Sequence, residues 1–196
     1  LVAAGIEVTL VPASVDSLRG EVILYVAMGD EDLRSPLIVS MPKRFPTGQV
    51  CPTPVNAPDL MTTIISLMGV KAPLAVHGRD LTPLLENPAM NWPHACLYEH
   101  MGNQYGSTAV ETVRTHRKQE NYQGVPMYTA VVQNGWKLIH YLDGESGEEL
   151  YDLQKDPEEL HNLIKESTHA AQAQKLRQAM KAELEHAEAP FAAGLE

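Results

Sequence analysis

The hydrophobic pattern of the first half of the chain predicts strands followed by one helix. Residues 1–28 contain two β-rich runs, IEVTLVP and EVILYVA. A continuous apolar run at 37–39, within an expected strand at 36–41, is typical of a strand that is covered on both faces. Segment 57–70 then repeats apolar residues at helical spacing and ends near Gly69, which predicts a helix. The buried stripe expected for this helix is Leu60, Ile64, Leu67 and Met68.

Beyond Pro93 the apolar residues alternate with polar ones, which predicts antiparallel strands. The expected strands are 94–101, 107–115, 127–133, 135–142 and 148–153. Turn residues in NGW and DGESG, after the third and fourth of these segments, indicate hairpins.

Two helices are expected near the C-terminus. Asp156, followed by Pro157 and Glu158, has the residue order of a capped helix start. The Ala-rich segment 169–188 predicts the last helix. Its apolar face is expected to contain Leu176 and Met180, with either Leu184 or Ala173 completing it.

These elements predict an α/β fold, in which the end of an α/β domain precedes a small antiparallel sheet with a C-terminal helix. We divide the chain into an N-terminal segment 1–28, the final part of the α/β domain at 29–89, and the antiparallel-sheet subdomain at 90–196.

Charge and composition exclude several classes of partner. The 196 residues have a formal net charge of −10, which argues against a nucleic acid or an anionic membrane as the main partner. No run of about 18 apolar residues is available to span a bilayer. The only two cysteines, Cys51 and Cys96, form neither a disulfide framework nor a zinc motif, so the compartment stays unassigned. Because the chain begins at Leu1 without an initiator methionine, we expect it to be incomplete at this end.

Four blocks give the chain a family resemblance through their order. They are LRSPLIVSMP, APDLMTTIISLMGV, HGRDLTPLL and GWKLIHYLDGESGEELYDLQKDPEELHNLI. This succession resembles the C-terminal third of type I sulfatases, from Asp30 to about Leu163. The resemblance implies the end of an alkaline-phosphatase-like α/β domain, and it leaves residues 1–28 unmatched.

The resemblance also implies what chemistry the parent enzyme uses. Type I sulfatases hydrolyse sulfate esters with a formylglycine, made from the Cys or Ser of a C-x-P-S-R motif, and with calcium held by Asp and Asn. Residues 51–55, CPTPV, fail this motif because Thr53 and Val55 replace its Pro and Arg. No Asp-Asp pair and no D-H-G or D-N-G turn precedes Arg34. We therefore expect no catalytic residue and no metal ligand here, and an inactive isolated chain; calcium and formylglycine belong to a full-length parent.

Four residues are candidates for contacting the substrate: Glu99, His100, Arg114 and His116. Within a strand, His100 shares a face with Tyr98, and Glu99 points to the other face. Arg114 and His116 would likewise share a face, in a segment that is more positively charged than the rest of the chain. By resemblance, these residues line the rim of a sulfatase cleft and select the organic part of a sulfate ester; the alternative is a solvated hairpin.

Other functions stay open on the sequence alone. The chain is also compatible with a non-catalytic remnant or interaction module, and with a phosphodiesterase or phosphonate hydrolase of the same superfamily. In each case the strand at 36–41 and the helix at 57–70 lack a full set of neighbours. We therefore expect exposed core surface and self-association.

Overall fold

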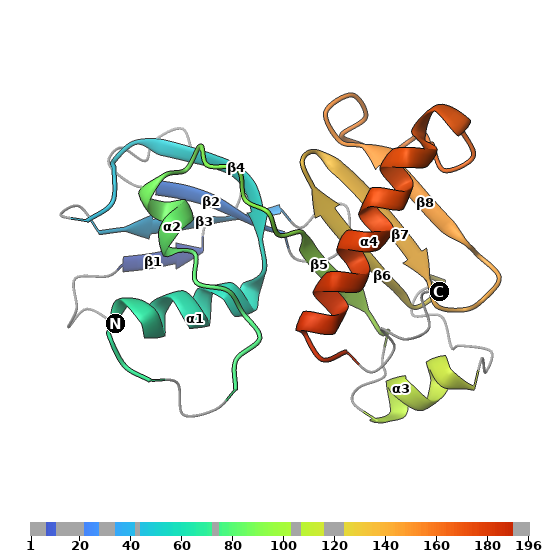
Figure 1. Ribbon diagram of the computed structural model, residues 1–196, viewed down its shortest axis with the longest axis horizontal. Coiled ribbons are helices and arrows are strands. Elements are labelled where there is room, and N and C mark those ends of the chain that lie inside the picture. Colours follow the sequence, from blue (N-terminus) through green and yellow to red (C-terminus); the bar gives the residue numbers. More distant parts are fainter. Residues whose placement is uncertain are drawn as a thin grey trace. The chain divides into compact units, whose positions relative to one another are not determined.

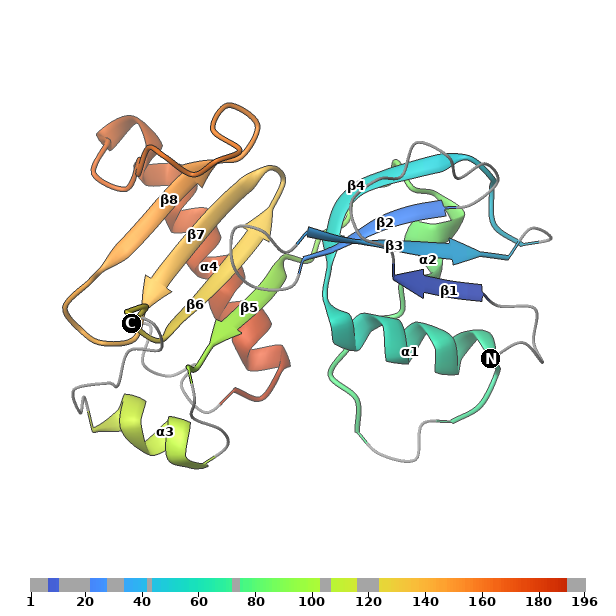
Figure 2. The same ribbon diagram turned by 180° about the vertical axis from the view of Figure 1, so that it is seen from behind.

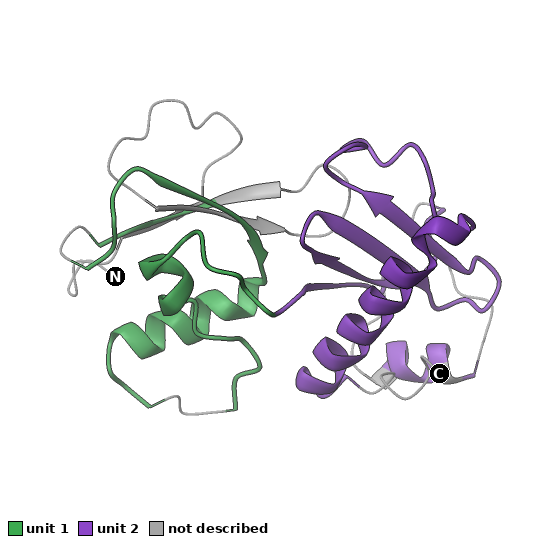
Figure 3. Ribbon diagram, turned by 45° about the horizontal axis from the view of Figure 1, so that its top comes forward, with its two compact units in different colours: residues 1–93 green, residues 94–196 purple. Residues whose placement is uncertain are grey.

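The computed structural model describes residues 7–10, 22–27, 34–41, 44–71, 75–102, 107–115 and 124–189. Figure 1 shows one sheet in each half of the chain. The halves form two compact units, residues 1–93 and residues 94–196 (Figure 3). The mixed α/β fold agrees with the expected fold class.

Unit 1 contains a four-stranded mixed sheet in the order β1-β3-β2-β4. Its strands are β1 (Glu7–Leu10), β2 (Val22–Ala27), β3 (Arg34–Ser40) and β4 (Gln49–Val55). β3 pairs antiparallel with β1 and β2, whereas β2 and β4 run parallel. Leu37, Ile38 and Val39 are 0%, 3% and 4% exposed, which confirms the strand expected to be covered on both faces.

β4 is a strand that the sequence pattern did not predict. Pro52 and Pro54 lie inside it, and a proline cannot donate a ladder hydrogen bond. β4 is nevertheless the outermost strand of the described sheet, where prolines are tolerated. Cys51 and Val55 are almost fully buried, so packing of these side chains decides the conformation.

α1 (Ala57–Leu67) confirms the expected helix. The backbone N–H of Asn56 donates to Oδ2 of Asp59 at 2.9 Å, which satisfies a donor at the helix start. Pro58 lies in the first turn, where no N–H donor is needed. The helix ends where Gly69 adopts a left-handed φ of +66°.

The buried face of α1 differs from the expected one. Leu60 and Leu67 pack against the core, but Met68 is 39% exposed. Asp59 and Thr63 are buried instead, at 2% and 3% exposed. Burying these polar side chains is tolerated because the loop that follows the helix satisfies their hydrogen bonds.

That loop, residues 75–81, is held against α1 by side chains of the helix. The carboxylate of Asp59 accepts the backbone N–H of Arg79 at 2.8 Å, and Thr63 Oγ1 accepts that of Leu81 at 2.9 Å. A Cβ atom on Gly78 would lie only 2.1 Å from the carbonyl oxygen of Pro58. The HGRDL turn therefore requires glycine for a close backbone approach.

α2 (Thr82–Glu86) follows this loop and completes the core of unit 1. The carboxylate of Asp80 accepts the N–H of Thr82 at 2.8 Å and a hydrogen bond from Ser66 at 2.6 Å. The buried core residues of unit 1 are Leu37, Val39, Phe45, Cys51, Val55, Leu81, Leu84 and Leu85.

Unit 2 contains an antiparallel sheet in chain order, with a helix on one face. Its strands are β5 (Cys96–His100), β6 (Tyr128–Gln133), β7 (Trp136–Tyr141) and β8 (Glu148–Asp152). Asn134 and Gly135 connect β6 to β7 with φ values of +52° and +78°, which is the two-residue turn that the sequence predicted. Figure 2 shows the sheet with α4 (Ala170–His186) behind it.

α4 confirms the expected C-terminal helix and its apolar stripe. A short 3₁₀ turn, η2 (Ser167–His169), precedes it. The buried stripe is Ala173, Leu176, Met180 and Leu184. This stripe packs on Ala95, Val131, Leu138 and Leu150 of the sheet side. Glu183, also buried, accepts the backbone N–H of Ala95 at 3.2 Å and so ties the entry of β5 to the helix.

The expected strand at 107–115 is wrong, because the segment forms helix α3 (Ser107–Arg114). Its β-branched residues favour a strand, but no strand of the described sheet pairs with it. Ala109 and Thr112, three residues apart, are 4% and 8% exposed, so the helix buries one narrow face.

The helix expected after Asp156 is also absent. The Asp156 carboxylate accepts the backbone N–H groups of Leu160 and His161 at 3.1 and 2.8 Å and closes a turn. Glu159 has a φ of +56°, which lies outside the helical region. Its carboxylate lies 2.6 Å from Nζ of Lys137, and the two side chains are only 11% and 12% exposed. This enclosed ion pair outweighs the helix propensity of the segment.

Gly78→Ala is expected to destabilise unit 1 by roughly 2–3 kcal/mol, because the new methyl group overlaps the backbone of Pro58. Gly48→Ala is the matched control: its Cβ would meet open space, and its positive φ costs about 1 kcal/mol. Urea unfolding of both variants measures the difference. Equal losses would contradict the close approach of residues 75–81 to α1.

Self-association stays a prediction, and the structure supplies positions for its test. Met61 of α1 and Met68, the residue that follows α1, lie about two helical turns apart and are 58% and 39% exposed. Replacing both by glutamate is expected to lower the concentration dependence of sedimentation, because charge opposes burial of this face. Leu160→Glu, at a position 69% exposed in unit 2, is the control. A chain that sediments as a monomer at every concentration would overturn the prediction.

Candidate functional site

A row of three rings crosses one end of the unit 2 sheet. β5 ends at His100, β6 begins at Tyr128 and β7 ends at Tyr141, and the strand register pairs these residues in that order. The His100 and Tyr128 rings are stacked, with centroids 5.2 Å apart and planes 18° apart. Tyr141 meets Tyr128 edge-on, at 5.9 Å and 72°. We call these three residues the ring row.

The ring row lies on the sheet face opposite α4. Tyr128 belongs to a cluster with Ala130, Ile139 and Tyr151, whereas the intervening residues Val131 and Leu138 pack toward the helix. Successive side chains along each strand point to opposite faces of the sheet, which places the two clusters on opposite faces. Tyr128 is buried, and His100 and Tyr141 are half-buried.

The expected site residues separate into two groups. Glu99 and His100 are neighbours in β5 and therefore point to opposite faces of the sheet. Arg114 is the last residue of α3 and is described by its backbone alone. His116 lies outside the described residues. Because 107–115 is a helix, the expectation that Arg114 shares a strand face with His116 is wrong.

One topological feature still connects these candidates. The chain leaves the sheet at the end of β5 and returns at the start of β6, and α3 lies on this excursion, residues 101–127. Figures 1 and 2 both show α3 beyond the end of the sheet where β5 stops. The ring row and the excursion therefore share one end of the sheet.

Glu99 is exposed, yet the protein around it changes its titration. Neighbouring protein atoms partly desolvate the Glu99 carboxyl and so raise its pKa above the ordinary value. A carboxyl with a raised pKa holds its proton at higher pH than a free one does.

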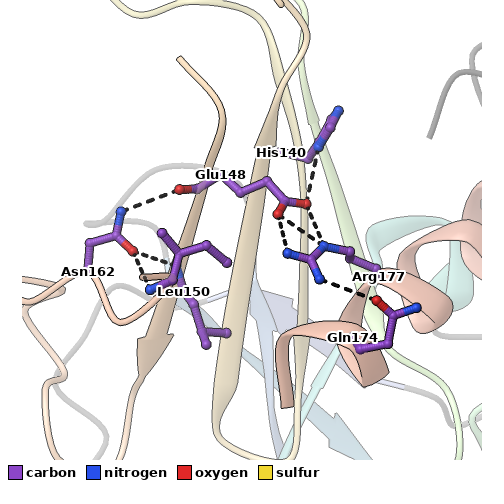
Figure 4. Close-up of polar contacts among 7 residues, drawn as sticks. His140, Glu148, Leu150, Asn162, Gln174 and Arg177 are labelled. Carbon is purple, nitrogen blue, oxygen red and sulfur yellow. Dashed lines mark hydrogen bonds and ion pairs between the residues drawn. The ribbon is translucent and has the colours of Figure 1, made fainter. Parts of the chain in front are cut away.

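A polar cluster that sequence reasoning missed lies on the α4 side of the sheet. Arg177 of α4 donates to both carboxylate oxygens of Glu148, at 2.6 to 3.0 Å (Figure 4). Nδ1 of His140 lies 3.4 Å from the same carboxylate, and Gln174 accepts a hydrogen bond from Arg177 at 3.3 Å. The residues are too far apart in sequence for spacing to reveal the cluster. Only the charge of Arg177 at the edge of an apolar stripe was visible.

This cluster clamps the helix to the sheet. Burial acts to raise the pKa of Glu148, but hydrogen bonds from His140 and Arg177, together with their charges, lower that pKa to about 2. Close by, Asn162 Oδ1 accepts the backbone N–H of Leu150 at 3.1 Å and joins the turn after β8 to the strand (Figure 4). The cluster thus has a structural role.

No metal centre is present among the residues that the structure describes. No group of three or more His, Cys, Asp or Glu side chains in these ranges is arranged to hold a metal ion. The calcium implied by the resemblance therefore has no fitting donor set in them. Cys51 of unit 1 and Cys96 of unit 2 are both buried and form no disulfide with each other. Among the described helices, none has the length and apolar character needed to cross a bilayer.

Comparison with known proteins now gives the family. The family described as "N-sulphoglucosamine sulphohydrolase, C-terminal" matches residues 25–188. The chain belongs to this sulfatase family. The match begins in β2 and ends just past α4, so it includes both units.

A curated sulfatase is similar in sequence to the chain, and solved structures share its fold. An N-acetylglucosamine-6-O-sulfatase of Bacteroides thetaiotaomicron is 28% identical over 158 residues, which is 79% of this chain but 25% of the relative. A solved structure in complex with its substrate D-glucosamine-2-N,6-O-disulfate has 24% identity and a TM-score of 0.58, over 80% of this chain and 29% of the other. The phosphonate monoester hydrolase of Agrobacterium radiobacter has 22% identity and a TM-score of 0.60, over 82% and 31%.

The coverage values show that the chain matches only part of each relative. It spans about a quarter of the length of the first curated relative. The late block of the sulfatase resemblance forms β7, β8 and the following turn, from which Glu159 pairs with Lys137 of β7. Lys137 and Glu159 therefore have a structural role in this block.

Removal of the Glu148 clamp is expected to change the acid sensitivity of the chain. The pKa of Glu148 is lower in the folded state, so its stabilising effect is complete above about pH 4.5 and is lost as pH falls toward 2. After a discount for solvent screening of the partly exposed Arg177, the lowered pKa corresponds to roughly 2 kcal/mol. Arg177→Met is expected to lose about half of this at pH 6, because His140 continues to lower the pKa of Glu148, and to lose less at pH 3.

Urea unfolding at both pH values measures this difference. Lys175→Met, on the same helix, is the control because Lys175 is exposed and takes no part in the cluster. An equal effect of Arg177→Met at pH 6 and pH 3 would contradict the clamp.

Proposed function

We propose that this chain is the C-terminal part of a sulfatase whose parent enzyme hydrolyses sulfate esters. The observation that supports this most is the family match over residues 25–188, which includes both units. The first curated relative is an N-acetylglucosamine-6-O-sulfatase, so a sulfated amino sugar is the first substrate to examine.

In this proposal the reaction centre lies outside the chain. CPTPV at 51–55 lacks the formylglycine motif, and β4 buries Cys51 completely, which keeps its thiol away from any substrate. The described residues offer no calcium site. The nucleophile and the metal would come from a preceding segment, which makes the isolated chain inactive.

The contribution of this chain would be scaffold and specificity. Unit 1 would supply the last strands of the main α/β sheet, and unit 2 would supply a rim where β5 ends and β6 begins. We propose that Glu99, His100, Arg114 and His116 contact the organic part of the ester. The excursion 101–127 contains Arg114, Arg117 and Lys118, and these cations would offset the net charge of −10 that otherwise repels a sulfate group.

One alternative has specific support. The structural likeness to a phosphonate monoester hydrolase has the same strength as the likeness to sulfatases, and both show the fold alone. A parent that cleaves phosphonate monoesters or phosphodiesters is therefore the second candidate. If a longer form of the protein is also inactive, this result would favour a non-catalytic remnant.

The test is an ester panel on two forms of the protein. We expect the 196-residue chain to be inactive on an aryl sulfate with added calcium, and a form extended upstream through the C-x-P-S-R segment to hydrolyse it. Phosphonate monoesters and phosphodiesters complete the panel, and the long form with its motif Cys or Ser replaced by Ala is the control.

Each result has a distinct meaning. Activity of the short chain would place a reaction centre within these residues and overturn our assignment. Hydrolysis of phosphonates with no hydrolysis of sulfates by the long form would favour the second candidate.

A further inference from the structure

The geometry of the ring row has a consequence for His100. An imidazole at a strand end ordinarily has rotational freedom about two side-chain torsions. Here its plane lies within 18° of the Tyr128 ring at a centroid distance of 5.2 Å, which is an offset-stacked arrangement. The stack therefore fixes both the position and the plane of the His100 ring.

Tyr128 is suited to act as the support of this stack. It is only 6% exposed and belongs to a cluster with Ala130, Ile139 and Tyr151, so its own rotamer is locked by packing. Tyr141 then closes the other side of Tyr128, edge-on at 72°. Each ring of the row restrains the next one, from β7 to β6 to β5.

The location of the row connects this restraint with recognition. His100 is half-buried, at the last position of β5, where the chain begins the excursion that carries α3 and Arg114. Nε2 of this imidazole is buried, so the half-buried ring presents the rest of its edge and face in one defined direction. The hydroxyls and ring faces of a sugar are groups that such a side chain can discriminate.

We propose that Tyr128 and Tyr141 are positioning residues that hold the imidazole of His100 in the orientation in which it contacts the organic part of the ester. This proposal rests on the proposed function, in which His100 belongs to the substrate rim. It adds two residues that the sequence analysis did not single out. Tyr128 and Tyr141 act through His100 and need not touch the substrate.

The first experiment is an NMR measurement on the 196-residue chain, which needs no activity. A ring stacked on tyrosine experiences a ring-current shift, so the carbon-bound protons of the His100 imidazole are expected upfield of those of exposed histidines. His100→Ala assigns these signals. Tyr128→Leu is expected to abolish the upfield shift, and Tyr128→Phe to preserve it, because the stack needs the ring and not the hydroxyl.

Tyr151→Leu is the matched control for general destabilisation. Tyr151 is 7% exposed and lies in the same cluster as Tyr128, but it makes its hydrogen bond to Glu149 and is not part of the ring row. This variant is expected to leave the His100 signals in place while it lowers the melting temperature. An unchanged His100 shift in Tyr128→Leu, or an equal change in Tyr151→Leu, would overturn the proposal.

The second experiment is kinetic and uses the upstream-extended protein with its best ester. Tyr128→Leu is expected to raise KM roughly threefold to tenfold with little change in kcat, which is the effect of losing one ring-mediated contact. Tyr128→Phe is expected to restore the original KM, and His100→Ala to raise KM at least as much as Tyr128→Leu.

The two experiments separate the possible failures. A long form that hydrolyses no ester would refute the proposed function and, with it, the substrate role of His100, whatever the NMR spectra show. An active long form whose KM is unchanged by Tyr128→Leu would overturn the positioning role alone. Loss of the NMR shift together with a raised KM, both rescued by Tyr128→Phe, is the result that supports the proposal.

Discussion

The strand register of unit 2 is the constraint on which its core, its clamp and its candidate site all depend. Because side chains alternate between the two faces, a slip of one residue would send the whole apolar row away from α4 and turn the ring row toward it. Two features fix this register. The Asn134-Gly135 turn sets the pairing of β6 with β7, and the Arg177–Glu148 ion pair joins the start of β8 to the helix.

Several polar groups among the described residues stabilise the fold. Asp59, Asp156 and Glu183 each accept backbone N–H groups that would otherwise be costly to bury or leave unsatisfied. This explains why the family's blocks can be well defined in a chain that contains so little identifiable chemistry. Asp and Gly in HGRDL, Lys in GWKLI and Glu in DPEEL serve contacts between segments far apart in sequence.

The chain belongs to a sulfatase family, and its described residues contain no fitting metal site. These two findings are compatible. The chain spans a quarter of its first curated relative, and the strands and helices it contains are those of that family's C-terminal region. In the function we propose, such a scaffold would act on a reaction by holding side chains such as His100 at the rim of a cleft. Packed rings and strand register would hold them there.

The sequence by itself determined most elements of this protein and its family. Local sequence patterns were sufficient to predict three features: the apolar run of β3, the Asn-Gly hairpin and the apolar stripe of α4. Tertiary contacts decided the rest. They made a strand of the proline-containing β4 because Cys51 and Val55 are buried there, and a helix of α3 despite its β-branched residues. They also replaced the helix after Asp156 by a turn, in which Glu159 has a left-handed backbone and pairs with Lys137. The candidate site follows the same division: the residues of β5 were visible in the sequence. The stacking of His100 on Tyr128 arises from strand pairing between residues 28 positions apart, which no local pattern encodes, and Tyr141 joins them through the β6–β7 hairpin.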